Sequence, residues 1–344
     1  MHRIRFHRLF LCLTWRRQRN AIIEPHSQSL FLELPADIVS YLCQEHLQPA
    51  SVVALSLACK DLFDLVFPRA RLGLSNAERE DLQLLLERDL GHGWWYCHSC
   101  SVLHPISAWG PTGGGSYREP ERDDCRHDRR SLAGSRFTIG YQTVRLAMNR
   151  HFLGPPNGLL LENFEVKGIS FSFGSVCWQE KWSAKILQDE LFLFSRRTLS
   201  GIHQTDEALR AALDNESYEI CWHVRTSGAP VSIVKALHCA SPGPAGFFVP
   251  CHDVVDSCPR CLTDYATTVE RRFEDVQERW GRKRTRAYWF ITITSYHRLG
   301  SGRSPLDPKW QAFAGRLSIP WFQIRRDMVA YPQGAVKVVW EEGD

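Results

Sequence analysis

A short apolar stretch near the N-terminus, from Leu34 to Val66, places the strongest constraint on how this chain can fold. Apolar residues recur within it at helical spacing, and Pro35 suits the first turn of a helix, where no amide donor is needed. A second run, with Ser51 as its expected N-cap, continues until Pro68 ends it. Helices this short cannot bury all of their apolar surface against one another. We therefore expect the segment to complete its core on a partner protein.

The length and composition are those of an ordinary globular protein with room for two domains. The chain has 344 residues, of which 44% are hydrophobic and 23% charged. Its net charge of +4 is too small to indicate nucleic acid or a membrane surface as a partner. The sequence also contains no stretch that is long and apolar enough to span a bilayer. We therefore expect neither a membrane nor a nucleic-acid partner.

The N-terminal segment, residues 1–29, is basic and predicts a disordered leader. Its apolar run at 9–13 is at the short limit for a secretory signal, and arginines follow where a small-residue cleavage site should be. A mitochondrial presequence is the alternative for this Arg-rich start. The basic run at 279–286 is interpreted as a solvated helix end, with a nuclear signal as the alternative. We expect a cytoplasmic and/or nuclear protein, in which clustered cysteines stay reduced and indicate metal.

The segment after the apolar stretch predicts a connecting helix within residues 71–95. Ser75 and Glu78 form a capping box, and four leucines provide the apolar face of the helix that it opens. Residues 110–135 contain three consecutive glycines and a dense charged run, so we expect a flexible loop there. These glycines lack the Gly-Lys-Ser/Thr ending of a phosphate-binding loop.

Alternating apolar residues dominate the rest of the chain and predict strands. Strand-like runs lie at 164–173, 182–194, 218–225, 288–294 and 335–340. Helices are expected at 139–152, at 205–213 and, in a charged form, at 269–280. The predicted fold class is α+β: a small all-helical unit at 30–70 is followed by a mixed, largely antiparallel sheet domain with helices over residues 96–344. The strand order does not follow from the pattern.

Cysteines and histidines gather in two clusters that predict structural zinc. Each cluster contains a Cys-x-x-Cys pair, which can place two thiolates on one tetrahedral ion. The first cluster offers the ligands Cys97, Cys100, His104 and Cys125. The second cluster offers the ligands Cys239, His252, Cys258 and Cys261. Because all four positions are filled by protein in each set, we expect structural rather than catalytic ions.

Other groupings of the same residues stay open. Cys251 could replace His252, or a single four-cysteine site could unite the two Cys-x-x-Cys pairs. We favour two local sites because they need less loop closure. The remaining cysteines are interpreted as ordinary buried residues: Cys12, Cys43, Cys59, Cys177 and Cys221.

Motifs of the common catalytic sites are missing from the sequence, so we expect no enzymatic activity. There is no His-Glu-x-x-His, no Gly-x-Ser-x-Gly and no His-x-Glu paired with Pro-Cys-x-x-Cys in deaminase order. A redox-active Cys-x-x-Cys would leave the surrounding histidines and cysteines unexplained.

The N-terminal apolar stretch resembles the F-box, a three-helix module. The resemblance is carried by Leu34-Pro35 with Ile38 and Leu42, by Leu47-Gln48-Pro49 and by the run from Leu55 to Phe63. Five later segments resemble F-box proteins of filamentous fungi. These segments are Tyr96-Cys97-His98-Ser99-Cys100, Leu103-His104-Pro105, the run from Cys258 to Tyr265, Leu299-Gly300-Ser301-Gly302 and the run from Ser304 to Trp310. One departure is Leu62-Phe63, which stands where many F-boxes have a tryptophan.

The resemblance implies a substrate receptor of a ubiquitin ligase. F-box helices dock on a Skp-type adaptor that hangs from a cullin, and the rest of the chain presents an unknown protein substrate. By position, the adaptor contacts would come from Leu34, Pro35, Ile38, Leu42, Leu47, Val53, Leu57 and Phe63. The alternative is a zinc-stabilised interaction protein whose F-box binds the adaptor without a role in degradation.

Overall fold

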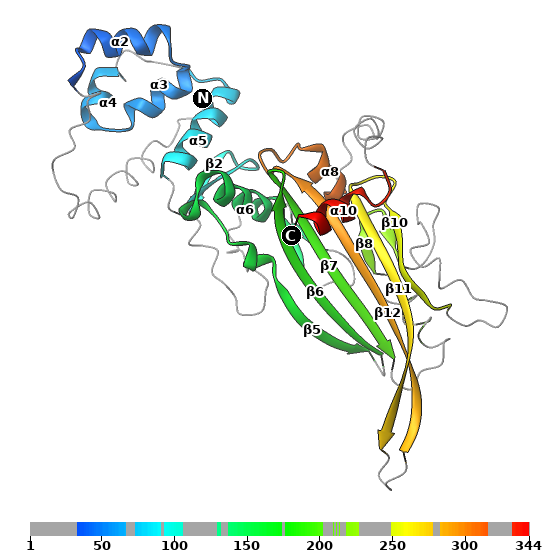
Figure 1. The fold of residues 1–344 in the computed structure, drawn as a ribbon. Coiled ribbons are helices and arrows are strands. Elements are labelled where there is room, and N and C mark those ends of the chain that lie inside the picture. The colour runs from blue at the N-terminus through cyan, green and yellow to red at the C-terminus, as the bar shows by residue number, and fades with distance from the viewer. Residues whose placement is uncertain are drawn as a thin grey trace. The chain divides into compact units, whose positions relative to one another are not determined.

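The chain combines helices with a large antiparallel sheet, which confirms the α+β class (Figure 1). The computed structural model describes residues 33–66, 73–90, 93–105, 129–131, 137–173, 176–201, 209, 211, 213, 218–226, 249–277, 283–315 and 332–343. The predicted leader and most of the predicted 110–135 loop and 205–213 helix lie outside these residues. The chain divides into two compact units, Met1–Leu85 and Leu86–Asp344. None of the helices described has the length and apolarity needed to cross a membrane.

The first unit contains three short helices, α2 (Ala36–Glu45), α3 (Pro49–Ser56) and α4 (Lys60–Val66). The run expected to begin at the N-cap Ser51 forms two helices, and the N-cap of the first is Gln48, so the predicted cap is wrong. The Cys59 sulfur accepts a hydrogen bond from the amide of Leu62 at 3.5 Å. This contact satisfies one of the amides that the first turn of α4 leaves without an intrahelical partner. Four buried residues form the core of this unit: Val39, Val52, Leu62 and Val66.

The next helix, α5 (Asn76–Leu90), begins at the predicted capping box. The backbone amide of Ser75 donates to Glu78 Oε2 at 2.7 Å, and the amide of Glu78 donates to Ser75 Oγ at 3.3 Å. These two bonds satisfy donors that the first turn of a helix leaves without an intrahelical partner. The structure therefore confirms the predicted start of the connecting helix.

A six-stranded antiparallel sheet organises the second unit, in the order β10-β11-β12-β7-β6-β5 (Figure 1). Its strands are β5 (Val166–Phe173), β6 (Val176–Leu187), β7 (Glu190–Gly201), β10 (Cys251–Ser257), β11 (Thr263–Gln277) and β12 (Lys283–Gly300). Two three-stranded meanders thus meet where β7 pairs with β12. The shorter elements are β1 (Trp94–Cys97), β2 (Val102–Pro105), β3 (Arg129–Ser131), β4 (Thr138–Gly140), α6 (Tyr141–Leu153), η3 (Pro155–Asn157), η4 (Leu161–Phe164), β8 (Glu219–Cys221), β9 (Val224–Arg225), α8 (Pro308–Ala314) and α10 (Ala335–Glu342).

Alternation along β7 divides the core between the two faces of the sheet. Leu191 and Leu193 pack with α6 and α8 on one face. Phe192 and Phe194 point the other way and pack with Trp340 of α10. Both faces are therefore covered, and the strands carry large apolar side chains on each side.

Two elements differ in type from the prediction: a predicted helix is a strand, and a predicted strand is a helix. The predicted charged helix at 269–280 is strand β11 as far as Gln277, because it pairs with β12 along its whole length, from Thr263↔His297 to Gln277↔Lys283. Cross-strand pairing here outweighs the helical pattern of charges. The predicted strand at 335–340 is helix α10, whereas the helix predicted at 139–152 is confirmed as α6. The run at 182–194 is divided between β6 and β7 by a turn at Gln188-Asp189.

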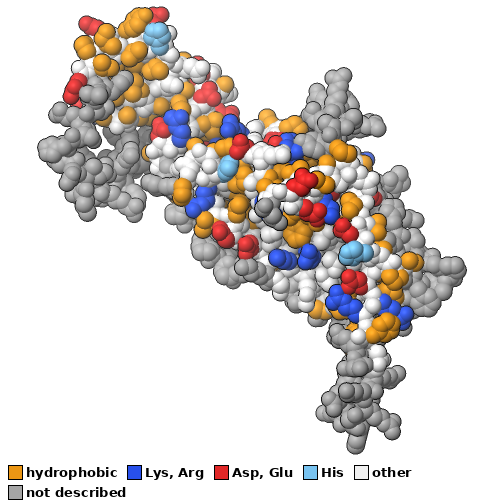
Figure 2. All heavy atoms as spheres, viewed as in Figure 1, with side chains coloured by type: hydrophobic (Ala, Val, Ile, Leu, Met, Phe, Trp, Pro, Cys, Tyr) orange, Lys and Arg blue, Asp and Glu red, His pale blue; other side chains and the backbone are white. Residues whose placement is uncertain are grey.

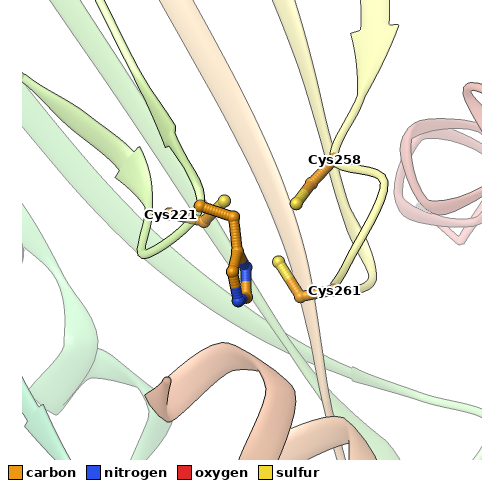
Figure 3. Close-up of side chains that lie close together, drawn as sticks. Cys221, Cys258 and Cys261 are labelled. Carbon is orange, nitrogen blue, oxygen red and sulfur yellow. The ribbon is translucent and has the colours of Figure 1, made fainter. Parts of the chain in front are cut away.

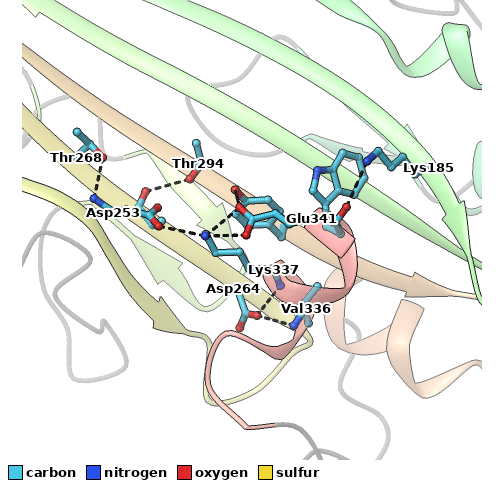
Figure 4. Close-up of polar contacts among 11 residues, drawn as sticks. Lys185, Asp253, Asp264, Thr268, Thr294, Val336, Lys337 and Glu341 are labelled. Atoms are coloured by element: carbon cyan, nitrogen blue, oxygen red, sulfur yellow. Dashed lines mark hydrogen bonds and ion pairs between the residues drawn. The ribbon is translucent and has the colours of Figure 1, made fainter. Parts of the chain in front are cut away.

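Helix α10 is attached to the sheet by a buried carboxylate (Figure 4). Asp264 Oδ2 of β11 accepts the amides of Val336 at 2.7 Å and Lys337 at 3.0 Å, in the first turn of the helix. Lys337 Nζ bonds Glu341 in the next turn and Asp253 of β10 at 3.1 Å. A carboxylate at this end of a helix satisfies orphan amides and complements the helix dipole.

Candidate metal centre

Two tight turns from distant parts of the chain supply the candidate metal ligands. Strands β8 and β9 form a hairpin whose strand end and turn carry Cys221 and His223. The connection between β10 and β11 carries Cys258 and Cys261. Both turns pack on the sheet face opposite α10, within an apolar cluster that includes Trp178, Leu199 and Tyr265.

The four side chains converge on one point. Their candidate ligand atoms, three sulfurs and one ring nitrogen, all lie within 4.8 Å of one another. Figure 3 shows the sulfurs of the three cysteines directed toward a common centre. All four residues are buried, and Cys221 is wholly inaccessible to solvent. The cluster is therefore a buried Cys₃His set that is suited to binding a metal ion.

Backbone hydrogen bonds shape the Cys258–Cys261 turn. The Cys258 amide donates to the Thr263 carbonyl, and the Thr263 amide donates to the Cys261 carbonyl, both at 2.8 Å. The Arg260 amide donates to Cys258 Sγ at 3.4 Å. A hydrogen bond to the charged form stabilises that form, so this amide favours a thiolate at Cys258.

The thiols influence one another's protonation. Burial would raise the pKa of Cys258, but the thiols of Cys221 and Cys261 and the ring of His223 outweigh burial and hold that pKa well below its usual range. Burial, together with the thiols beside them, raises the pKa values of Cys221 and Cys261. The cluster without metal thus concentrates negative charge on Cys258. A divalent ion would release the protons of the other thiols on binding.

His223 provides the test of whether these residues fit a metal. Its side chain is buried, and apart from the thiol of Cys258 beside it neither ring nitrogen has a hydrogen-bond partner. Buried imidazole nitrogens without partners carry a desolvation cost that an isolated core histidine would have to bear. Coordination of an ion by one nitrogen removes part of that cost. The donor set of three thiolates and one imidazole matches the structural sites of zinc.

A chain of hydrogen bonds leads from the centre into the sheet. Cys261 Sγ lies 3.2 Å from Thr263 Oγ1, which lies 3.0 Å from His297 Nδ1. His297 Nε2 lies 3.0 Å from Ser295 Oγ, and that hydroxyl lies 2.6 Å from Ser195 Oγ. Hydrogen bonds made to a metal ligand by its neighbours orient that ligand and influence the charge on its donor atom.

The direction of the proton donors in this chain depends on which ring nitrogen of His297 carries its proton. Burial, with Arg197 nearby, lowers the pKa of His297 to about 3, so the ring is neutral and has a single N–H. If Nδ1 carries that proton, His297 donates to Thr263 and accepts from Ser295 through Nε2. The Thr263 hydroxyl is then free to donate to Cys261 Sγ. This arrangement stabilises a thiolate at Cys261.

The structure brings Cys258 and Cys261 of the second predicted cluster together but does not bring His252 to them. His252 is exposed on β10, away from the centre, and Cys239 lies outside the described residues. The alternative ligand Cys251 is half-buried and donates to the Thr267 carbonyl at 3.8 Å. The candidate ligands that join the pair are Cys221, for which the sequence predicts an ordinary buried residue, and His223, which the predicted clusters do not include. Their Cys-x-His spacing inside a strand-like run was the available signal.

The first predicted cluster is brought together in part. Cys97, Cys100 and His104 lie with their ligand atoms within 4.8 Å of one another, and Cys125 lies outside the described residues. This group is separate from the buried centre. The alternative in which one four-cysteine site unites both Cys-x-x-Cys pairs is therefore wrong.

The predicted adaptor-binding residues differ in their exposure. Leu34, Pro35, Ile38 and Leu47 are exposed. Leu42, Leu57 and Phe63 are half-buried. Val53 is buried, with 7% of its surface exposed, so it serves the packing of the helical unit itself.

Comparison with known proteins identifies no relative. No protein-family model matches the chain, and no curated protein and no solved structure shows significant similarity to it. The F-box resemblance of the N-terminal helices therefore stays a prediction from sequence.

Proposed function

We propose that this chain is a substrate receptor of a Skp–cullin ubiquitin ligase. The helices of the first unit would dock on a Skp-type adaptor, and the second unit would bind a protein substrate. Zinc at the Cys₃His centre would hold the second unit in its folded form. The F-box motifs in the sequence support the first part of this proposal, and the buried ligand cluster supports the last.

The observation that carries the proposal is the exposed apolar surface of the first unit. Ile38 and Tyr41 have 46% and 56% of their surface exposed, and Leu34 and Leu47 each have 38%. Figure 2 shows hydrophobic side chains gathered on the viewed face of this unit. The core of the unit consists of four other residues, which are Val39, Val52, Leu62 and Val66. Its exposed apolar residues are thus available for a partner, as expected of a docking module.

Affinity purification of the full chain tests the proposal. The double variant Leu34→Ala, Pro35→Ala should lose the adaptor and, with it, the cullin, because both changes remove exposed side chains beside α2. The matched control is Glu45→Ala, an exposed polar position at the other end of the same helix, which should retain both partners. Retention of the adaptor by the folded double variant would refute the docking role.

The same purification separates degradation from simple association. Proteins bound to the second unit should accumulate in cells that express the double variant, because they are no longer brought to the ligase. Quantitative mass spectrometry of these proteins would identify the substrate. Unchanged levels of every bound protein would favour an interaction protein that binds the adaptor without a role in degradation.

A further inference from the structure

The hairpin β1–β2 holds a second group of metal-ligand side chains. In its register, Cys97 lies opposite Val102 and Trp95 lies opposite His104, so Cys97 and His104 share one face of the hairpin. The turn between the strands brings Cys100 toward the same face, where its sulfur lies 2.9 Å from His104 Nε2. All three ligand atoms lie within 4.8 Å of one another.

The hairpin is held in place by a buried carboxylate and by the stacking of one ligand ring. The buried Glu87 carboxylate accepts the Tyr96 amide at 2.9 Å and also bonds Arg145 Nε at 3.2 Å and Asn149 Nδ2 at 2.8 Å. The ring of His104 stacks on Trp95 with 5.3 Å between ring centroids. The ligands are therefore preorganised, which lowers the entropic cost of binding an ion.

The neighbouring histidine does not belong to this group. His98 Nε2 lies 3.4 Å from Arg145 Nη1, and its ring makes edge contacts with Tyr96 and Tyr141. Because the Nε2 atom of His98 faces the positively charged guanidinium of Arg145, that atom is not placed to bind a metal ion. Among the described residues, the candidate site thus offers two thiols and one imidazole, which are soft or borderline donors.

Solvent access distinguishes this group from the Cys₃His centre. Cys97 is buried, but Cys100 and His104 are only half-buried, whereas all four members of the other cluster are buried. Within the described residues, three ligands converge on the hairpin. Because solvent reaches Cys100 and His104, water and chelators can reach an ion held there, so this ion can exchange.

We propose that Cys97, Cys100 and His104 bind a second divalent ion of the zinc class, and that this ion exchanges faster than the one at the Cys₃His centre. All three residues belong to the second unit, so this proposal does not rest on adaptor docking. The hairpin site would be filled or emptied as free zinc varies, while the buried site stays loaded.

Zinc content of the purified full chain tests this proposal. The wild type should hold about two zinc ions per chain, and Cys100→Ser and His104→Ala should each hold about one. Cys177→Ser is the matched control, because Cys177 is a half-buried cysteine of β6 outside both clusters. It should keep about two ions. A wild-type content that neither hairpin variant reduces would overturn the proposal, provided that both variants keep the wild-type circular dichroism.

Release to a chromophoric chelator tests the exchange rate. The wild type should release its zinc in a fast and a slow phase of about equal amplitude, and Cys100→Ser and His104→Ala should lose the fast phase. Loss of the slow phase in these variants would show that the hairpin ion is the more tightly held one, which contradicts the proposal. Because two separate ligands are replaced, misfolding of one variant would still leave the other as a test.

Discussion

Thr263 is the residue through which the metal centre contacts the interior of the sheet. Its hydroxyl lies between the ligand Cys261 and the neutral ring of His297. The side chain is buried, with 1% of its surface exposed, so water cannot replace this contact. We therefore expect Thr263 to influence how much charge the Cys261 sulfur presents to an ion.

Thr263→Val should weaken zinc binding at the centre by roughly 10- to 100-fold, because it removes the hydroxyl that contacts Cys261 Sγ while keeping the shape of the side chain. Competition with a chelator of known affinity measures this change. The matched control is Thr198→Val, which removes a threonine hydroxyl paired with Thr292 on neighbouring strands of the same sheet. Equal zinc affinities for Thr263→Val and Thr198→Val would contradict the assigned role.

The ligands that sequence reasoning found are those that lie close together in the chain. Cys258 and Cys261 are three residues apart, so their shared turn follows from spacing alone. Cys221 and His223 come from a hairpin more than thirty residues earlier, and only the fold brings them to the same point. Pattern reasoning cannot supply such a long-range contact without the strand order.

At the scale of elements, helix α10 depends on a side chain from the sheet. Val336, Val338 and Val339 gave this segment the appearance of a strand, because β-branched residues favour strands. The helix forms because Val336 and Trp340, four residues apart, pack on the sheet while Asp264 binds its first amides. The decisive interaction comes from more than seventy residues away and leaves no local pattern in the sequence.

Asp264→Ala should destabilise the second unit by about 2 kcal/mol or more, because it removes a buried carboxylate that accepts two helix amides. Urea unfolding measures the loss, and hydrogen exchange should show faster exchange at Val336 and Lys337. The matched control is Glu341→Gln, which changes an exposed partner of Lys337 on the same helix. It should cost less than about 0.5 kcal/mol. Equal losses for the two variants would contradict the capping role.

At the scale of the whole molecule, the two units differ in what stabilises them. The first unit has a small core of aliphatic residues from three short helices. The second unit has a large core on both faces of its sheet, with the Cys₃His centre inside the main cluster. Zinc should therefore matter for the second unit and not for the first.

Removal of zinc by a strong chelator should lower the unfolding temperature of the second unit by many degrees and leave the helical content of the first unchanged. The reason is that the four buried ligands would lose their ion in the middle of the core, and structural zinc contributes on the order of 10 kcal/mol to folding. Scanning calorimetry with and without chelator measures the shift, and added zinc should restore the original transition. A metal-free second unit with an unchanged transition would exclude a structural ion.

The docking of the first unit on a Skp-type adaptor is the central claim, and titration calorimetry with the purified full chain and adaptor tests it most directly. The wild type should bind with one-to-one stoichiometry, and Ile38→Asp should weaken binding by roughly 30-fold or more, because it places a charge in the apolar surface. Ile38 lies in the first turn of α2, where an aspartate suits the helix dipole, so the fold should be kept. Glu45→Ala should bind as the wild type does. No binding by the folded wild type, or equal binding by Ile38→Asp, would contradict the account.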